Sequence, residues 1–339
     1  DYRSNITVEK VTPQPYVTVN NVKWATGNFI HYKQGTKEYW GIAPAQWWIS
    51  NYGDNPDSKY QRDGRTLQSR GLGSQSWYVG NNIGLFKQDP DDIDLFQWGV
   101  IKDALNLKAD GCLLGIGQHN IDGNYYPNRG NVFVNPTPSN NRNNATHGDI
   151  VKYYTEDGTK HYHYRYPKEG ELELLCKAKT IIPAFCYTDR GNKIYGAFFS
   201  DMPFVGVMTK FPTGRKIWKY QDVTGLVLAN KGLFLPITGR RPGGVSWNRV
   251  NVDERFVDNN LSLIHISEPN NSGFYGQYHS SKGMSDLTER GLFFGAAFKM
   301  DVATPSKLQG SAIRPVYAGA DNKDETKPID AAKFAPFNN

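Results

Sequence analysis

Turn-forming residues interrupt this chain so often that long helices and long strands are not expected. Its 339 residues include 34 Gly and 19 Pro, which belong to turns. No stretch approaches the ~20 consecutive apolar residues that cross a bilayer as a helix. The 20 Tyr, 17 Phe and 8 Trp can still build a core, because each aromatic side chain buries a large area. The composition therefore predicts a β-rich fold of short strands and long loops.

The apolar pattern predicts which segments form strands. Val17 and Val19, and then Val22 and Trp24 after a turn at Asn20-Asn21, alternate as strand residues do. Further strands are predicted at 150–154, 160–166, 193–199, 204–209, 225–229 and 232–237.

Two segments favour helices instead. Apolar residues recur at near-helical spacing over 93–107, after Asp91-Asp92, whose charges suit a helix N-terminus. A short helix is also expected over 171–179. The segment 117–149 lacks periodicity, and a loop of that length usually serves interaction.

No internal repeat or linker divides the chain into two independent domains. We expect an N-terminal arm or strand at 1–21, a body at 22–317 with large loop insertions, and a C-terminal tail at 318–339. Asp1–Val19 and Ala318–Asn339 are candidate arms for self-association, because an extended segment can add to an open sheet edge of a second copy. A structural subunit of a surface filament, assembled by such strand exchange, is therefore the alternative to a binding module.

Four segments, in order, resemble the Fibrobacter succinogenes major paralogous domain family of Bacteroidetes surface proteins. The first resembles its opening strand, the second its acidic-aromatic element, the third its "FLP-x-x-G-x-R" strand and the fourth its closing strand. They are Val22-Lys-Trp-Ala-Thr-Gly-Asn28, Asp94-Leu-Phe-Gln-Trp-Gly99, Gly225–Arg241 and Gly310-Ser-Ala-Ile-Arg-Pro-Val316. The family's "W-R-L-P-T-x-x-E-W" helix start is not found, and Glu171–Lys179 occupies roughly that region.

The resemblance implies a C-type-lectin-like fold of the α+β class: a small twisted antiparallel sheet, one or two short helices and long functional loops. Related domains occur at fimbrial tips and on outer-membrane lipoproteins as binding modules. We therefore expect an exported or cell-surface adhesion protein, although the given chain carries no signal peptide.

One stretch is set aside. Residues 261–269, Leu-Ser-Leu-Ile-His-Ile-Ser-Glu-Pro, are identical to a translated reading frame of a widely used transposon sequencing adaptor. No chemistry is assigned to His265. Glu268-Pro269-Asn270 matches the letters of a C-type-lectin calcium loop, but it overlaps this stretch and supports no prediction. No cofactor is predicted, and calcium is left as an open alternative.

Motifs for the common enzyme classes are missing from the sequence. Neither a G-x-S-x-G elbow nor a P-loop occurs. His161 and His163 alternate and could share a metal, but further ligands are not identifiable, and an incidental strand face is preferred. The net charge of +6 is scattered, whereas a nucleic-acid binder concentrates its basic residues. We therefore expect neither an enzyme nor a nucleic-acid partner.

The richest candidate binding region is 240–260, and the resemblance implies that ligands are met there and at 272–281. Aromatic faces stack on sugar rings, and Asn, Asp and Arg provide planar hydrogen bonds to vicinal hydroxyls or carboxylates. A glycan or a surface protein is therefore the expected ligand. The predicted contact residues are Arg240, Arg241, Trp247, Asn248, Arg249, Asn251, Asp253, Tyr275 and Tyr278.

The three cysteines leave two alternatives open. Cys176 and Cys186 lie ten positions apart and could form a disulfide across a hairpin, or remain two buried thiols. Cys112 is left over. No CxxC motif occurs, so a structural zinc site is not expected.

Overall fold

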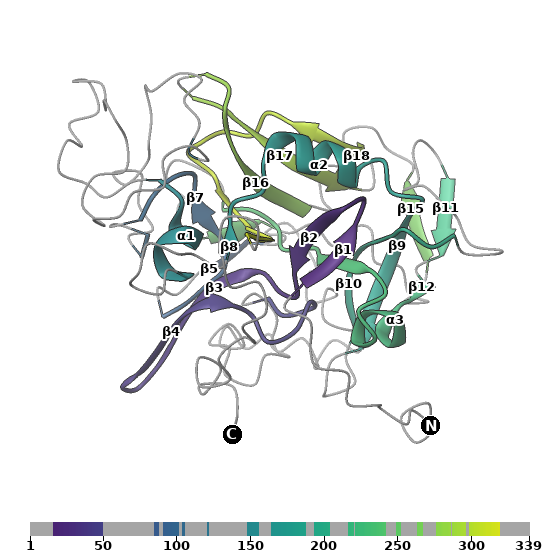
Figure 1. Cartoon of the computed structure of the whole chain (residues 1–339), viewed down its shortest axis with the longest axis horizontal. Coiled ribbons are helices and arrows are strands. Elements are labelled where there is room, and N and C mark those ends of the chain that lie inside the picture. Colours follow the sequence, from purple (N-terminus) through teal and green to yellow (C-terminus); the bar gives the residue numbers. More distant parts are fainter. Residues whose placement is uncertain are drawn as a thin grey trace.

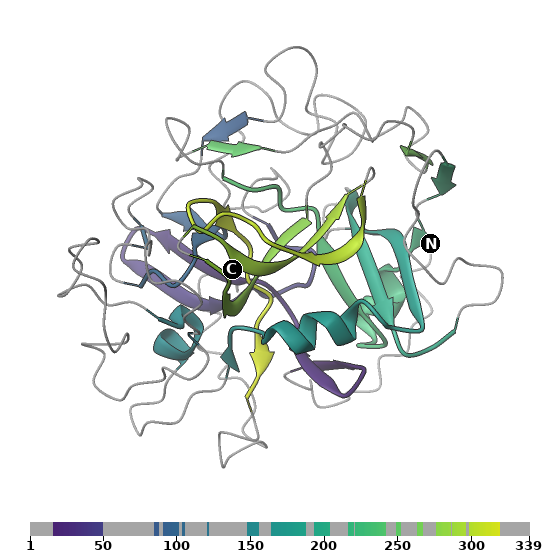
Figure 2. The same ribbon diagram turned by 90° about the horizontal axis from the view of Figure 1, so that it is seen from above.

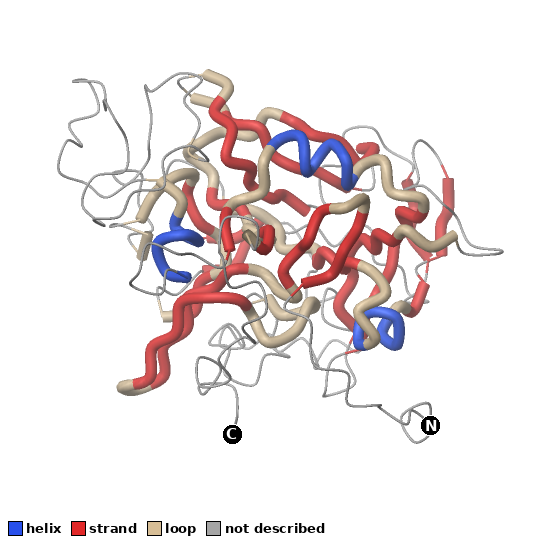
Figure 3. The backbone as a smooth tube through the Cα atoms, in the orientation of Figure 1, coloured by secondary structure: helices blue, strands red, loops and turns tan. Residues whose placement is uncertain are grey.

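The computed structural model describes fifteen stretches of the chain. They are residues 16–49, 85–87, 91–101, 104–105, 121, 148–155, 164–187, 193–203, 216–219, 221–241, 249–251, 263–266, 276–285, 287–295 and 298–318. These residues form short strands in several small sheets, together with three short helices (Figures 1 and 3). All strand pairs among them except β12–β9 are antiparallel. The prediction of a β-rich chain with few helices is thus confirmed.

One sheet joins the two ends of the described chain. Its order is β1 (Tyr16–Val19), β2 (Val22–Ala25), β20 (Val316–Tyr317) and β8 (Tyr164–Arg165). Asn20 and Asn21 have φ of 48° and 63°, the geometry of a type I′ hairpin turn. The predicted hairpin is confirmed, and the expected boundary between arm and body falls inside its turn.

A second sheet carries much of the core. Its order is β12 (Gln221–Asp222), β9 (Thr180–Tyr187), β10 (Lys193–Ser200) and β13 (Leu233–Pro236). The strands predicted at 193–199 and 232–237 are confirmed. Helix α2 (Glu169–Leu175) precedes β9 and confirms a short helix in this region. The strand predicted at 225–229 is wrong, because helix α3 (Thr224–Leu228) occupies it.

The N-terminal half also holds a projecting hairpin. Strands β3 (Phe29–Gln34) and β4 (Lys37–Ile42) pair along their full length, and β6 (Asp92–Ile93) joins β3. Strand β7 (Phe96–Gln97) pairs with β19 (Gly310–Ser311). The helix predicted over 93–107 is wrong for the part that is described, because β6 and β7 lie there.

Burial explains that error. Every residue from Ile93 to Ile101 is buried, so apolar residues occur on all sides and their spacing does not mark one helical face. The strand predicted at 150–154 is also wrong, because helix α1 (Ile150–Thr155) forms there. The Oδ1 atom of Asp149 accepts hydrogen bonds from the backbone N–H groups of Val151 and Lys152, both at 2.9 Å, which favours a helix start.

The C-terminal strands complete the body. Strands β16 (Gly276–Gly283), β17 (Glu289–Gly295) and β18 (Phe298–Ala303) form a meander, which crosses the middle of the molecule when viewed from above (Figure 2). Two further pairs are β11 (Lys216–Lys219) with β15 (Leu263–Ile266), and β14 (Arg249–Asn251) with β5 (Leu85–Lys87). Strand β15 lies within the adaptor-identical stretch.

Of the remaining predictions, the strand at 160–166 is confirmed in part by β8, and 204–209 lies outside the described residues. The chain segments 1–15 and 319–339 lie outside them too, as do His161, His163 and Cys112.

The described cysteines are two separate thiols. Cys176 follows α2 and Cys186 lies on β9, and both are free. Burial raises the pKa of Cys176 to about 12 and raises that of Cys186 well above its usual value. Neither thiol is ionised at neutral pH, so neither is a ready nucleophile.

Candidate functional site

Arg241 is an interior residue. Its side chain is 1% exposed, and its Nε and Nη2 atoms donate to the Leu95 carbonyl at 3.2 and 2.7 Å. Its backbone exchanges hydrogen bonds with Gly310 at 2.8 and 3.0 Å. The expectation that Arg241 contacts a ligand is therefore corrected, because its guanidinium is engaged inside the protein.

Tyr278 is likewise enclosed. It lies on β16, is 1% exposed, and donates its hydroxyl to the Pro236 carbonyl at 2.7 Å. Burial raises the pKa of this hydroxyl. Tyr278 therefore ties β16 to the end of β13 and does not face a ligand.

The other predicted contact residues divide into two groups. Arg240 is half-buried, and Arg249 and Asn251 lie on β14, where Arg249 pairs with Lys87 and Asn251 with Leu85. Trp247, Asn248, Asp253 and Tyr275 lie outside the described residues.

The two candidate binding segments join the body at neighbouring points. Gly239 forms a parallel bridge with Gly276, and Arg241 forms an antiparallel bridge with Gly310. The segment that follows Arg241 and the segment that precedes Gly276 are therefore attached to one rigid anchor, defined here as 236–241, 276–278 and 310–312. The bridges thus bring the start of one predicted binding region close to the other.

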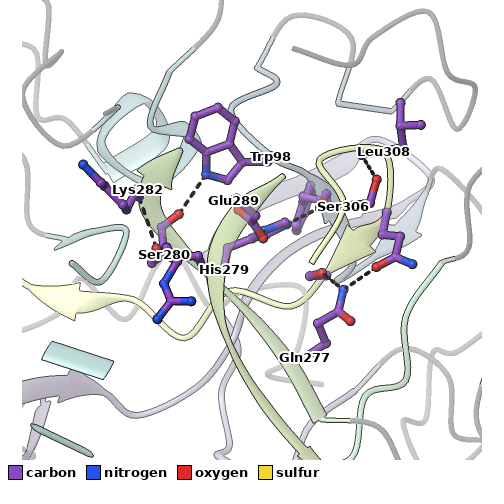
Figure 4. Close-up of polar contacts among 12 residues, drawn as sticks. Trp98, Gln277, His279, Ser280, Lys282, Glu289, Ser306 and Leu308 are labelled. Atoms are coloured by element: carbon purple, nitrogen blue, oxygen red, sulfur yellow. Dashed lines mark hydrogen bonds and ion pairs between the residues drawn. The ribbon is translucent and has the colours of Figure 1, made fainter. Parts of the chain in front are cut away.

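A buried histidine–glutamate pair connects β16 of the anchor to β17 and β7 (Figure 4). His279 on β16 and Glu289 on β17 have fully buried side chains, and His279 Nδ1 lies 2.5 Å from Glu289 Oε1. His279 Nε2 lies 2.5 Å from the Phe96 carbonyl oxygen, on β7. The carbonyl can only accept, so Nε2 carries a proton. A second proton then lies between Nδ1 and the carboxylate, on one partner or the other.

Burial sets the protonation of this pair. Desolvation raises the pKa of Glu289 to about 7, although His279 and Lys307 oppose the shift. Its second oxygen, Oε2, has no hydrogen-bond partner among the described residues. A buried carboxylate with one unsatisfied oxygen is costly when ionised, so Glu289 favours its protonated form more than an exposed glutamate does.

Lys307 is the third charged residue of this cluster. Its ammonium donates to the Ser285 carbonyl at 2.6 Å and lies 4.7 Å from the centroid of the Trp98 ring. Trp98 in turn donates its indole N–H to the Ser280 carbonyl at 2.8 Å (Figure 4). Lysine, indole and the His279–Glu289 pair thus fix the positions of β16, β17 and the 305–308 turn.

This cluster can transfer a proton in principle, but its geometry is that of a structural brace. The side chains of His279 and Glu289 are both 0% exposed, so no solute reaches them. Sequence reasoning missed the pair, because its members are ten residues apart across a hairpin. A correct prediction of the β16–β17 hairpin would have revealed the pair, because His279 lies opposite Gly291, two residues after Glu289.

Within the described stretches, no group of three or more His, Cys, Asp or Glu side chains is placed to hold a metal ion. Nor does any described helix have the length and apolarity that a bilayer crossing needs.

The comparisons with known proteins add no relative. No protein-family model matches the chain, and neither the curated proteins nor the solved structures contain a match.

Proposed function

We propose that this chain is a non-catalytic binding module of a bacterial cell surface, which recognises a glycan or a protein through 240–260 and through the part of 272–281 that precedes the buried strand β16. One observation carries the proposal. Both segments are attached to the same rigid anchor, through the Gly239–Gly276 and Arg241–Gly310 bridges. Loops carried by a well-packed frame are a common place for binding residues.

Two side chains of the anchor are hydrogen-bonded inside the protein, which separates residues that position the segments from residues that contact the ligand. Arg241 and Tyr278 bond to the backbone carbonyls of Leu95 and Pro236. They therefore position the segments, and the recognising side chains are those further along, above all Trp247 and Tyr275.

Two features support a C-type-lectin-like fold within the proposal. Strands from both ends of the described chain pair, with Trp24 opposite Val316. In addition, Arg165, Pro167 and Glu171 have the spacing of the R, P and E in the family's helix start, although none of its other defined positions is matched. Arg165 binds both carboxylate oxygens of Glu171, at 2.6 and 2.9 Å, and Glu171 accepts from the Lys168 N–H at 2.7 Å, which gives that spacing a physical role.

The first experiment is a glycan and protein array probed with the purified chain and with Trp247→Ala and Tyr275→Ala. We expect each substitution to weaken the strongest binding about tenfold or more, because a stacking ring is lost. Leu228→Ala is the matched control, since Leu228 is 72% exposed on α3. Unchanged binding by both variants would remove the two segments from recognition.

A second candidate function is a filament subunit that assembles by strand exchange. Tyr16 and Tyr317 stack with ring centroids 5.2 Å apart, so the segments 1–15 and 319–339 both join the body at one sheet. Strand β1 is an outer strand of that sheet, and an outer strand offers unpaired backbone groups to an added strand.

Light scattering and electron microscopy test this alternative. A subunit of this kind forms oligomers or filaments that disappear when residues 1–15 or 319–339 are deleted. A monomer at high concentration, with the full chain, argues against it.

A further inference from the structure

A cluster of partly exposed aromatic rings lies where the β3–β4 hairpin meets α1. Trp40 on β4 and Tyr153 and Tyr154 on α1 all retain partial exposure. The rings of Trp40 and Tyr154 are parallel, with centroids 4.1 Å apart and an interplanar angle of 1°. Tyr153 meets Tyr154 edge-on at 4.9 Å and 77°. These three residues are called the aromatic patch below.

The hairpin carries this patch from the core out to solvent. On one face of the hairpin, the pairs in order are Phe29–Ile42, His31–Trp40 and Lys33–Glu38. Phe29 and Ile42 are buried, whereas Lys33 and Glu38 are exposed. The hairpin projects from the body at this end, with α1 beside its base (Figure 1). The patch is therefore the outer margin of the core.

A fixed carboxylate borders the patch. Glu38 Oε1 accepts from His31 Nε2 at 2.8 Å and from Trp40 Nε1 at 3.3 Å. The hydrogen bond from His31 is the largest cause of a lowered pKa at Glu38, so its carboxylate is charged at neutral pH. Its side chain is nonetheless 48% exposed. A surface glutamate held by two ring N–H groups is pre-oriented for a further partner.

We propose that the aromatic patch together with Glu38 is a saccharide-binding site. A pyranose ring has an apolar C–H face that packs on an aromatic surface, and adjacent hydroxyls that donate to a carboxylate. The patch supplies the surface and Glu38 the acceptor at its edge. Because the carboxylate is already in place, binding does not have to order it, which favours affinity.

Glu38 also has a structural role, because it is a hydrogen-bond partner for the ring of the buried His31. His31 packs against Trp40 with ring centroids 4.2 Å apart, so Glu38 is held at the edge of the patch while about half of its side chain stays exposed. A cationic ligand fits less well, because cage sites hold an ammonium between ring faces and the Trp40–Tyr154 faces are in contact at 4.1 Å. A ligand that lies on the outer surface of the patch matches the geometry better.

This site is separate from the one proposed above, since it uses none of 240–260 or 272–281. The two proposals therefore fail independently.

A glycan array probed with the purified full chain tests the proposal, followed by saturation-transfer NMR on the most strongly bound glycan. We expect Tyr154→Ala to weaken that glycan at least tenfold, because its ring surface is removed. Glu38→Gln keeps the shape of the side chain but loses its charge, and should weaken the glycan several-fold with an unchanged melting temperature. Leu228→Ala, on the exposed surface of α3, should bind as the wild type does.

The outcomes separate the two sites. Loss of binding in Glu38→Gln and Tyr154→Ala, with Trp247→Ala intact, supports the aromatic patch and removes glycan recognition from 240–260. Loss in Trp247→Ala alone overturns the patch and leaves the function proposed above standing. A wild-type chain that binds no glycan on the array overturns the saccharide assignment. If Tyr154→Ala does not fold, Glu38→Gln decides alone, and unchanged glycan affinity in that variant also overturns the assignment.

Discussion

Arg314 shows how one side chain can connect distant parts of this molecule. It is 1% exposed, and its guanidinium donates to Asn28 Oδ1 at 2.8 Å and to Gln46 Oε1 and O at 3.2 and 2.9 Å. Gln46 passes the connection on to the N–H of Phe234 at 2.7 Å. Desolvation lowers the pKa of Arg314 to about 10, so it remains a cation at neutral pH.

Replacing Arg314 with Leu should therefore be severe. The substitution removes the Arg314 donor from Asn28 Oδ1 and from the Gln46 backbone carbonyl in the interior, and each buried acceptor left unsatisfied costs about 1–3 kcal/mol. Urea denaturation would measure the loss. A shift below about 1 kcal/mol would mean that the network relaxes around the leucine.

The His279–Glu289 pair predicts a pH dependence of stability. The pKa of Glu289 rises from 4.5 to about 7 on folding, so between these values this carboxyl binds more protons in the folded chain than in the unfolded one. The contribution of Glu289 to stability should then fall as pH rises from 4.5 to 7. Glu289→Gln should flatten this slope, because the amide can donate to His279 Nδ1 without titrating. Melting temperatures across this pH range would check it, and an equal slope in Glu289→Gln would contradict it.

Among the elements, the β1–β2 hairpin was predicted correctly because its information is local. The Asn20-Asn21 turn and the flanking Val and Trp residues specify the hairpin within ten positions of sequence. By contrast, β7 forms because Phe96 and Gln97 pair with Ser311 and Gly310, more than two hundred positions away. Neither the partner nor the burial of both faces is visible in a local window. For this reason the sequence pattern over 93–107 predicted a helix where two short strands form.

The candidate site divides in the same way. The sequence placed Trp247 and Tyr275 in segments that join one anchor, but could not separate Arg241 and Tyr278, which face inward, from residues that face outward. The aromatic patch escaped notice because Trp40 and Tyr154 are 114 positions apart and α1 was read as a strand.

The Asn20-Asn21 turn of the β1–β2 hairpin can be tested by substitution. Asn21 has a φ of 63°, which glycine adopts freely and β-branched residues adopt with strain. Asn21→Gly should leave the melting temperature unchanged or raise it. Asn21→Val should destabilise the chain by about 1–3 kcal/mol. Equal melting temperatures for the two variants would show that the turn relaxes to another conformation.

For the molecule as a whole, the packing bears on the adaptor-identical stretch at 261–269. Segments before and after it are interlocked: β2 pairs with β20, β7 pairs with β19, and Arg241 bridges Gly310. Such contacts require that the flanking parts belong to one fold. We therefore expect the stretch to interrupt a single gene rather than to join two unrelated genes.

Long-read sequencing of the source DNA across this region would test that expectation. The expected result is the same reading frame on both sides with different residues at 261–269. Two separate genes for the flanking parts would contradict it.

The pairing of Trp24 with Val316 also has a consequence for biosynthesis. Strand β2 leaves the ribosome early, whereas its partner β20 emerges only after nearly three hundred further residues have been translated. The nascent chain thus carries an unfinished sheet until β20 has been translated, so β2 waits for its partner strand while the residues between them emerge.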